Sequence, residues 1–379
     1  GIFKGSYAAE PAVFADNRLL FSWAADINQD YGLYTSNSDG SNMKLLYDNP
    51  GTAELRAKLI QPRPLPPIIP DSVSKTASLL PPPANGPYNQ DGTFIFNALN
   101  VYANGPVDAE IDTAPPVGSA AIIRFFIDQQ RSSSGSFPNL DWPILLGERP
   151  VNPDGSVKEP AAPANVPLFE QIRSSDGTVP LTPNGATHVA GMNFGPPGTE
   201  ARCVGCHVGH TMIPVPASDA EAKWSNLATG AQVTVSSARD ANTISGINDR
   251  KVMKGEIWRY WNSASGQPAN GQWVRLTFPV PVTVRNVRLY NPRPGDEANS
   301  TLQVHKATVR LYQDAAATTL AAQTTVSKDI SVSGTDVPFG NVLARVVEVK
   351  IDSITGTFYG MQVASLAELE VIARGEAIR

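Results

Sequence analysis

The sequence contains little cysteine, histidine or charge, and each shortage excludes a class of protein. Its 379 residues include only two cysteines and four histidines, and charged residues make up 17%. The cysteines lie three positions apart, a spacing that suits a redox disulfide but not a structural cross-link. No apolar run reaches the roughly 18 residues that a membrane-spanning helix needs, and the net charge of -5 lacks the basic excess of a nucleic-acid-binding protein. We therefore expect neither a membrane span nor a nucleic-acid partner.

Proline and glycine are abundant instead. The chain has 33 prolines and 30 glycines, and 41% of its residues are hydrophobic. This composition favours strands joined by long ordered loops over bundles of helices. The length allows two or three domains. We therefore predict a mainly β fold.

The N-terminal residues 1–60 are predicted to form paired strands. Strand-like runs flank a turn at Asp16 and Asn17 and a second turn at Asn37–Ser41. The pattern fits either a propeller-like blade or an ordinary β-meander. Because a propeller needs at least about four blades, these hairpins would belong to a larger propeller. Residues 61–90 follow as a proline-rich, extended linker.

Two further β-rich segments follow the linker. Residues 91–223 alternate short apolar runs, such as 120–127 and 143–150, with turns. In residues 224–379, longer strand-like runs with alternating apolar positions recur at regular spacing. This pattern predicts a C-terminal β-sandwich, or jelly roll, that is large enough to fold alone.

The strongest chemical motif is Cys203–His207, which has the C-x-x-C-H pattern of covalent haem c attachment. The two thiols are spaced to add to the two vinyl groups of a porphyrin, and the histidine that follows can then bind the iron. We therefore predict one covalent haem c in the β-rich domain 91–223. Cys203 and Cys206 would attach it, and His207 would be the proximal iron ligand.

Two other uses of these residues remain open. Zinc can be bound by Cys203, Cys206, His207 and His210, with His188 nearby, although structural zinc sites usually draw ligand pairs from separate segments. A thioredoxin-like disulfide is the second alternative. That motif belongs at the start of a helix beside a βαβ unit, and the sequence shows no such unit.

The distal iron ligand is predicted from the segment before the motif. His188 and Met192 lie upstream of a turn at Gly195–Gly198, which can fold this segment back towards the haem. His210 follows His207 too closely to reach the opposite face. We favour His188 as the distal ligand and keep Met192 as the second candidate. Histidine–methionine ligation would raise the reduction potential.

Residues from about 93 to 212 resemble the middle domain of hydrazine synthase α-subunit-like proteins. Leu146–Ser156, Pro163–Gln171 and the C-x-x-C-H motif carry this resemblance in their order along the chain. The strands before them resemble a blade of a TolB-like or WD40-like propeller. The resemblance implies a β-rich haem c domain attached to a propeller. A tyrosine that binds iron in the family's catalytic haem site corresponds to Thr211 here, so no catalytic role is carried over.

Residues 224–374 resemble a discoidin, or coagulation-factor C-type, galactose-binding-like domain. Asn226–Ala231, Gly271–Phe278 and Leu366–Val371 carry this resemblance. It implies a module that binds glycans or surfaces. Many such domains hold a structural calcium ion, so Ca2+ is a further candidate cofactor, although Gly246–Asp249 stands where family members commonly have Asp-Gly.

Three aromatic residues of this domain have two interpretations. Trp258, Tyr260 and Trp261 can stack on a sugar ring, or they can belong to the core. We favour the core.

These features together predict an exported electron-transfer protein with one haem, which works with redox partner proteins or other subunits of a complex. Because haem c is attached outside the reducing cytosol, we expect a periplasmic or extracellular location and a signal peptide that is not in this chain. The C-terminal module is expected to bind a glycan or a protein. A haem enzyme and a scaffold braced by haem remain alternatives. No paired carboxylates or Ser-His-Asp order stands out, so we expect an enzyme less than a carrier.

Overall fold

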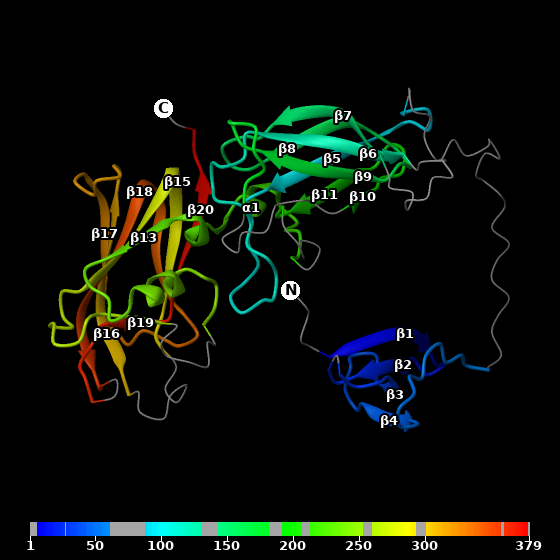
Figure 1. Cartoon of the computed structure of the whole chain (residues 1–379), viewed down its shortest axis with the longest axis horizontal. Helices are drawn as coiled ribbons and strands as arrows, with labels where there is room; N and C mark the ends of the chain where they lie inside the picture. The colour runs from blue at the N-terminus through cyan, green and yellow to red at the C-terminus, as the bar shows by residue number, and fades with distance from the viewer. Residues whose placement is uncertain are drawn as a thin grey trace, which may run out of the picture. The chain divides into compact units, whose positions relative to one another are not determined.

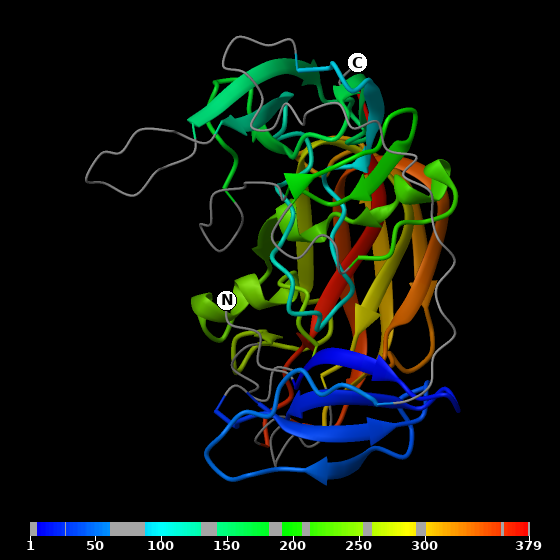
Figure 2. The ribbon, with the colours of Figure 1, turned by 90° about the vertical axis from the view of Figure 1, so that its right-hand side faces the viewer.

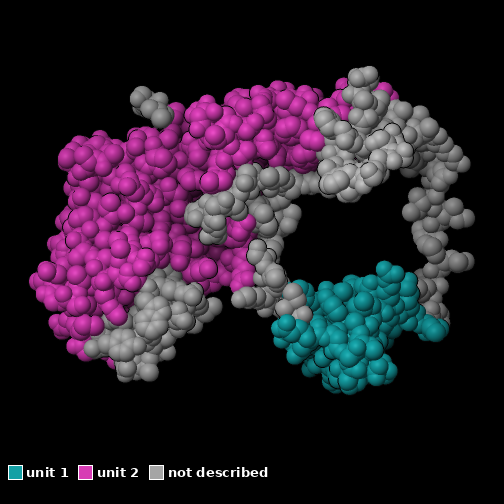
Figure 3. Space-filling view, in the orientation of Figure 1, with its two compact units in different colours: residues 1–77 teal, residues 78–379 magenta. Residues whose placement is uncertain are grey.

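The computed structural model describes residues 6–26, 28–60, 88–129, 142–181, 192–206, 213–252, 260–292, 301–357 and 360–377. The chain forms two compact units, residues 1–77 and residues 78–379 (Figure 3). Strands dominate both units, which confirms the predicted mainly β class (Figure 1). The predicted boundary at residue 224 falls inside the second unit and stays a prediction.

The first unit is a four-stranded antiparallel meander. Its strands follow one another in the order β1 (Tyr7–Val13), β2 (Leu19–Ala24), β3 (Gly32–Ser36) and β4 (Lys44–Tyr47). Every second residue of β2 is buried, as the alternating pattern requires. The paired strands predicted for this segment are therefore present. A four-stranded meander is also the form of one propeller blade, and the larger propeller stays a prediction.

The second unit begins with two small sheets. Their strands are β5 (Thr93–Asn100), β6 (Ile122–Gln129), β7 (Trp142–Pro150), β8 (Val157–Pro163), β9 (Leu168–Arg173), β10 (Met192–Asn193) and β11 (Glu200–Val204). One sheet has the order β10-β9-β6-β7, and the other has the order β11-β5-β8 with β11 parallel to β5. Apolar side chains of β5, β6 and β9 form a common core.

A tight turn joins β7 to β8, at the position where the sequence predicts one. The Asn152 N–H donates to the Ser156 carbonyl at 3.0 Å, and Gly155 has a φ of +82°. A Cβ on Gly155 would lie 2.5 Å from the Asn100 Oδ1. Glycine is therefore required here both by backbone conformation and by the close approach of β5.

The C-terminal part of the second unit is built from long antiparallel strands. Its elements are α1 (Asp219–Ala222), β12 (Ser225–Asn226), η2 (Ala228–Gly230), β13 (Gln232–Val235), η3 (Ala241–Ile247), β14 (Trp261–Asn262), β15 (Trp273–Tyr290), β16 (Gln303–Tyr312), β17 (Leu320–Val326), β18 (Thr335–Thr355), β19 (Ser365–Leu366) and β20 (Glu368–Gly375). The main sheet has the order β12-β20-β15-β18-β16-β17, with β13 also paired to β15. Figure 2 shows its long strands, coloured from yellow to red, running side by side.

Breaks in strand pairing divide the longest strands into two halves. The pairing of β15 with β18 shifts between Thr277 and Val282, where the sequence contains Pro279 and Pro281. Proline cannot donate to a ladder, so the two prolines interrupt the pairing there. The first half of β15 pairs with β13 and the second half with β20. The strands can thus bend over an apolar core, as the predicted sandwich requires.

A loop that follows β5 is anchored in the C-terminal part by Arg250. Arg250 is 5% exposed, and its Nη1 and Nη2 donate to the carbonyl oxygens of Gly105 and Ile111. In return, the Asp108 N–H donates to the Arg250 carbonyl at 2.7 Å. The Val252 N–H donates to the Asp108 Oδ1 at 2.7 Å. These contacts join segments about 140 positions apart in the sequence.

Replacing Arg250 with methionine should lower the free energy of unfolding of the full chain by about 3 kcal/mol, because two buried carbonyls lose their donors and nearby carboxylates lose a buried positive charge. Lys251→Met is the matched control, since Lys251 is the exposed neighbour. It should change the stability by less than about 0.5 kcal/mol. Urea unfolding measures both variants. Equal stability of the two variants would show that the Arg250 contacts do not hold the loop.

Candidate functional site

Both cysteines of the C-x-x-C-H motif lie beside β5. Cys203 belongs to β11 and pairs with Ala98, and the Cys206 N–H donates to the Val101 carbonyl at 3.1 Å. Gly205 between them has a φ of +76°, which turns the chain inwards after β11. Cys206 is 5% exposed and belongs to the core, against which the partly buried Cys203 packs.

Both cysteines are free thiols that resist ionisation. Neither forms a disulfide. Burial, with a smaller effect from the charge of Glu170, raises the pKa of Cys203 to about 12. Burial also raises the pKa of Cys206 well above its ordinary value, with contributions from Cys203 and Glu170. Both thiols are therefore protonated at neutral pH.

Glu170 places a carboxyl group near this thiol pair. It shares the buried face of β9 with Leu168 and Ile172 and is itself 1% exposed. Its Oε1 accepts a hydrogen bond from Asn193 Nδ2 at 2.7 Å. The buried Oε2 has no hydrogen-bond partner among the described residues. Burial, partly opposed by the Asn193 hydrogen bond, raises the pKa of Glu170 from 4.5 to about 8.

The segment with the predicted distal ligands ends next to Glu170. Met192 lies in β10, where its backbone pairs with Phe169, the residue before Glu170. Nothing is described of the Met192 side chain, and His188, His207, His210 and Thr211 lie outside the described residues. The structure thus brings Cys203, Cys206 and the backbone of Met192 to one region, around Glu170, and the axial ligands stay predictions.

The chemistry of this site distinguishes among the uses left open by the sequence. A reactive redox thiol requires a thiolate, which burial disfavours here, whereas a bound zinc ion would itself deprotonate its thiol ligands. A thioether carries no ionisable proton, so an apolar site suits it. Within the described ranges, no group of three or more His, Cys, Asp or Glu side chains is arranged to hold a metal ion. The surroundings of the sulfurs therefore argue against the redox disulfide, and both haem and zinc stay predictions.

Glu170 was not singled out by the sequence analysis. The sequence nevertheless contains a signal for a buried carboxyl group. Glu170 falls between the apolar residues Leu168 and Ile172 on one face of the strand. A carboxyl on such a face is expected in the core. What the pattern could not show is that the opposite sheet places two thiols within range of its charge.

Two expectations about the C-terminal part can be compared with the structure. Tyr260 and Trp261 are fully buried, so the core interpretation is confirmed for both and sugar stacking by them is wrong. Trp258 lies outside the described residues. Their polar atoms also point inwards: the Tyr260 hydroxyl donates to the Val252 carbonyl, and Trp261 Nε1 to the Ser237 carbonyl.

The calcium ion stays a prediction, and one observation bears on it. Arg250 interacts electrostatically with the carboxylates of Glu368, Asp112, Asp249 and Glu370. A buried guanidinium therefore already supplies positive charge to this acidic cluster. Calcium needs several oxygen ligands around one ion, and here the charge of those oxygens is partly compensated by an arginine.

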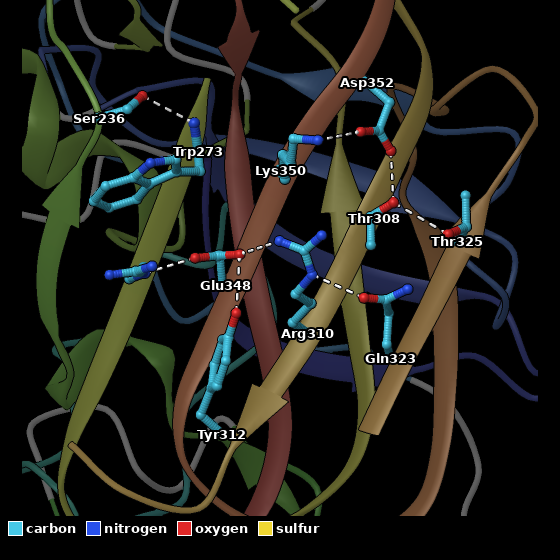
Figure 4. A network of polar contacts seen from close by, with 11 residues as sticks. Ser236, Trp273, Thr308, Arg310, Tyr312, Gln323, Thr325, Glu348, Lys350 and Asp352 are labelled. Carbon is cyan, nitrogen blue, oxygen red and sulfur yellow. Dashed lines mark hydrogen bonds and ion pairs between the residues drawn. The ribbon is translucent and has the colours of Figure 1, made fainter. Parts of the chain in front are cut away.

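A second candidate surface lies on the sheet of the C-terminal part. Trp273 begins β15, and the Arg275 guanidinium lies 4.3 Å from the centre of its ring. The Trp273 N–H donates to Ser236 Oγ at 2.9 Å, and the Ser236 hydroxyl donates to Gln272 Oε1 at 2.5 Å. Figure 4 shows that polar side chains continue from Trp273 across the neighbouring strands. Aromatic and hydrogen-bonding groups side by side are typical of sugar-binding surfaces.

Residues 226–372 match a family model described as "Domain of unknown function (DUF7402)". This range lies within the predicted C-terminal sandwich. A search of curated proteins finds no match to the sequence. Among the described residues, no helix is long and apolar enough to cross a membrane.

Several solved structures resemble part of the chain. A family 89 glycoside hydrolase from Clostridium perfringens is 15% identical over 40% of this chain and 15% of its own, with a TM-score of 0.31. This chain therefore spans only a small part of that enzyme. A fucose-binding module from Streptococcus pneumoniae is 21% identical over 40% of this chain and 96% of its own, with a TM-score of 0.28.

A family 32 carbohydrate-binding module of NanJ from C. perfringens, solved with galactose, is 17% identical over 37% of this chain and 92% of its own, with a TM-score of 0.26. The scores are low for all three structures. We therefore derive the function from this chain's own side chains.

Replacing Glu170 with glutamine should remove a pH dependence of stability. The folded-state pKa of about 8 exceeds the ordinary 4.5, so the unfolded chain releases this proton first as the pH rises. Stability is then lost between these values, at up to about 1.4 kcal/mol per pH unit. Urea unfolding at several pH values should show a shallower slope for Glu170→Gln. The exposed Glu148→Gln is the control and should keep the wild-type slope. Parallel wild-type and Glu170→Gln curves would mean that Glu170 is ionised in the folded chain.

Proposed function

We propose that this chain is an exported haem c protein that passes electrons to partner proteins or to other subunits of a complex. One observation supports this function above the others. The two thiols of the C-x-x-C-H motif lie together, unbridged, in a buried site where an ionised sulfur is disfavoured.

The chemistry of attachment fits this site. Each thiol would add across one vinyl group of the porphyrin, so that a sulfur–carbon bond forms and the thiol hydrogen moves to the second vinyl carbon. This addition needs no external oxidant or reductant. Cys203 and Cys206 would hold the haem in this way, and His207 would bind its iron. The haem would supply one-electron redox chemistry.

The protein environment would contribute in two ways. Apolar residues of β5, β6 and β9 exclude water from the thiols, and low solvent exposure is one of the factors that sets a haem potential. Glu170 would add a neutral carboxyl group near the attachment point at pH 7, since its pKa lies at about 8. We propose a periplasmic or extracellular location, because the haem is attached outside the cytosol.

A second candidate function is carbohydrate binding by the C-terminal part. It is supported by the face of β15, where Trp273 lies beside Arg275 and the Ser236–Gln272 pair. The two functions are compatible, because the thiol pair and this face are built from different strands of one unit.

The purified full chain should carry covalent haem when it is produced in a host that exports and matures c-type cytochromes. A denaturing gel stained for haem peroxidase activity should show a band that disappears in Cys203→Ala/Cys206→Ala. The His305→Ala variant removes a partly exposed histidine of β16 and should keep the band. A colourless wild-type protein that contains zinc would contradict the haem function.

The iron should be six-coordinate with His188 opposite His207. The reduced wild-type protein should then bind carbon monoxide weakly, because both axial positions are filled, whereas His188→Ala should bind it readily. Absorption spectra of the reduced proteins with and without carbon monoxide measure the difference. Met192→Ala is the matched variant and should behave like the wild type. If instead a near-infrared methionine band is present and vanishes in Met192→Ala, Met192 is the distal ligand.

A further inference from the structure

One row of polar side chains crosses four neighbouring strands of the C-terminal sheet. Strand register places Arg275 of β15 opposite Glu348 of β18, Glu348 opposite Arg310 of β16, and Arg310 opposite Gln323 of β17. Directly paired residues point to the same side of a sheet, so the four side chains form a continuous line. We call these four residues the arginine row, and Figure 4 labels three of them, Glu348, Arg310 and Gln323.

Glu348 lies at the centre of the arginine row and accepts from both sides. Arg275 Nε donates to its Oε2 at 2.6 Å, and Arg310 Nη1 donates to its Oε1 at 2.9 Å. The Tyr312 hydroxyl also approaches Oε1, at 3.4 Å. Arg310 Nε donates to Gln323 Oε1 at 2.8 Å. Both oxygens of the Glu348 carboxylate therefore already accept hydrogen bonds from arginines of the row.

The two arginines keep unused donors and an unbalanced charge. Their side chains are 32% and 29% exposed, whereas the side chain of Glu348 is 3% exposed. Both Nη atoms of Arg275 and Nη2 of Arg310 have no acceptor among the described residues. Two guanidinium groups share one carboxylate, so the row carries a net positive charge on a chain whose net charge is -5.

The neighbouring polar line does not cancel this charge. Lys350 and Asp352 form an ion pair at 3.2 Å, so their charges compensate each other. Thr308 donates to Asp352 Oδ2 at 2.5 Å and lies 3.1 Å from the hydroxyl of Thr325. This second line is therefore neutral, and the excess positive charge belongs to the arginine row.

Geometry favours a flat, repeating ligand with acidic groups. Arg275 and Arg310 are separated by one intervening strand, so their backbones lie two strand spacings apart, about 9.6 Å. Free guanidinium N–H groups bind carboxylate and sulfate oxygens in pairs, with a specificity that a lysine does not provide. At the end of the row, the Arg275 guanidinium lies over the ring of Trp273, 4.3 Å from its centre, and this cation–π contact helps to hold the guanidinium in place.

We propose that the arginine row is a binding surface for acidic polysaccharides, whose uronate or sulfate groups are held by Arg275 and Arg310. This assignment rests on the carbohydrate-binding candidate function and names its ligand class. The charge of the row complements an acidic chain of sugars. The nearly buried Glu348 orients both guanidinium groups, and the N–H groups that it does not bind are left for the ligand.

Affinity electrophoresis of the full chain tests the assignment. Polygalacturonate and chondroitin sulfate serve as acidic probes, and dextran and galactan as neutral ones. The acidic polymers should retard the wild type, and added salt should weaken the retardation. Arg275→Gln/Arg310→Gln should weaken it by about tenfold or more. Arg285→Gln/Arg288→Gln is the matched control, since it also removes two positive charges, both from ion-paired arginines of β15 outside the arginine row.

Other outcomes of this experiment would overturn part or all of the proposal. Retardation by neutral polymers that survives the double variant would leave carbohydrate binding standing and overturn the arginine row as the site. No retardation by any polymer would overturn both. Equal retention of double-stranded DNA would overturn selectivity for polysaccharides. If the double variant unfolds, Arg310→Lys replaces it. This variant keeps the positive charge but lacks the paired guanidinium donors, so it should still weaken binding.

Discussion

The free-energy cost of removing an ion from water governs the polar sites of residues 78–379. One hydrophobic core runs from Phe94 of β5 to Ala373 of β20, so a charge near it must be compensated, neutralised or turned outwards. All three solutions are found among the described residues. Arg250 is buried and compensated by carbonyls and carboxylates, Glu170 is buried and shifted towards its neutral form, and Arg275 is turned towards solvent.

The shared core also relates the two proposed functions. Ala98 of β5 and Cys206 belong to the same cluster as Val274 of β15, so the surroundings of the thiols and the sheet are parts of one packed body. An electron carrier must approach its partner closely, and a rigid body has fewer orientations to lose than two tethered domains. Binding of a polysaccharide at the sheet would therefore limit the orientations in which the thiol region meets a redox partner.

Much of the fold could be predicted from the sequence because strands have a simple period. The meander of residues 7–47, the turn around Gly155 and the long strands after residue 224 follow from alternation and turn residues. The two cysteines of the site could also be singled out from the sequence, because the C-x-x-C-H motif consists of five consecutive residues. The roles of Glu170, Arg250 and Glu348 were not predicted. Their partners lie between 23 and 145 positions away, and cross-strand register is not encoded in any short pattern.

Burial separates arginines that hold the fold from arginines that can bind a ligand. The guanidinium of Arg250 is buried, and its loss would leave uncompensated carbonyls and carboxylates in the core. The nearly buried carboxylate of Glu348 needs a positive partner, but one arginine already balances its single charge, so the second arginine adds charge beyond that balance. Its positive charge instead raises the local potential and leaves unused donors at the surface. The stability of the sheet does not require these donors, whereas an acidic ligand does.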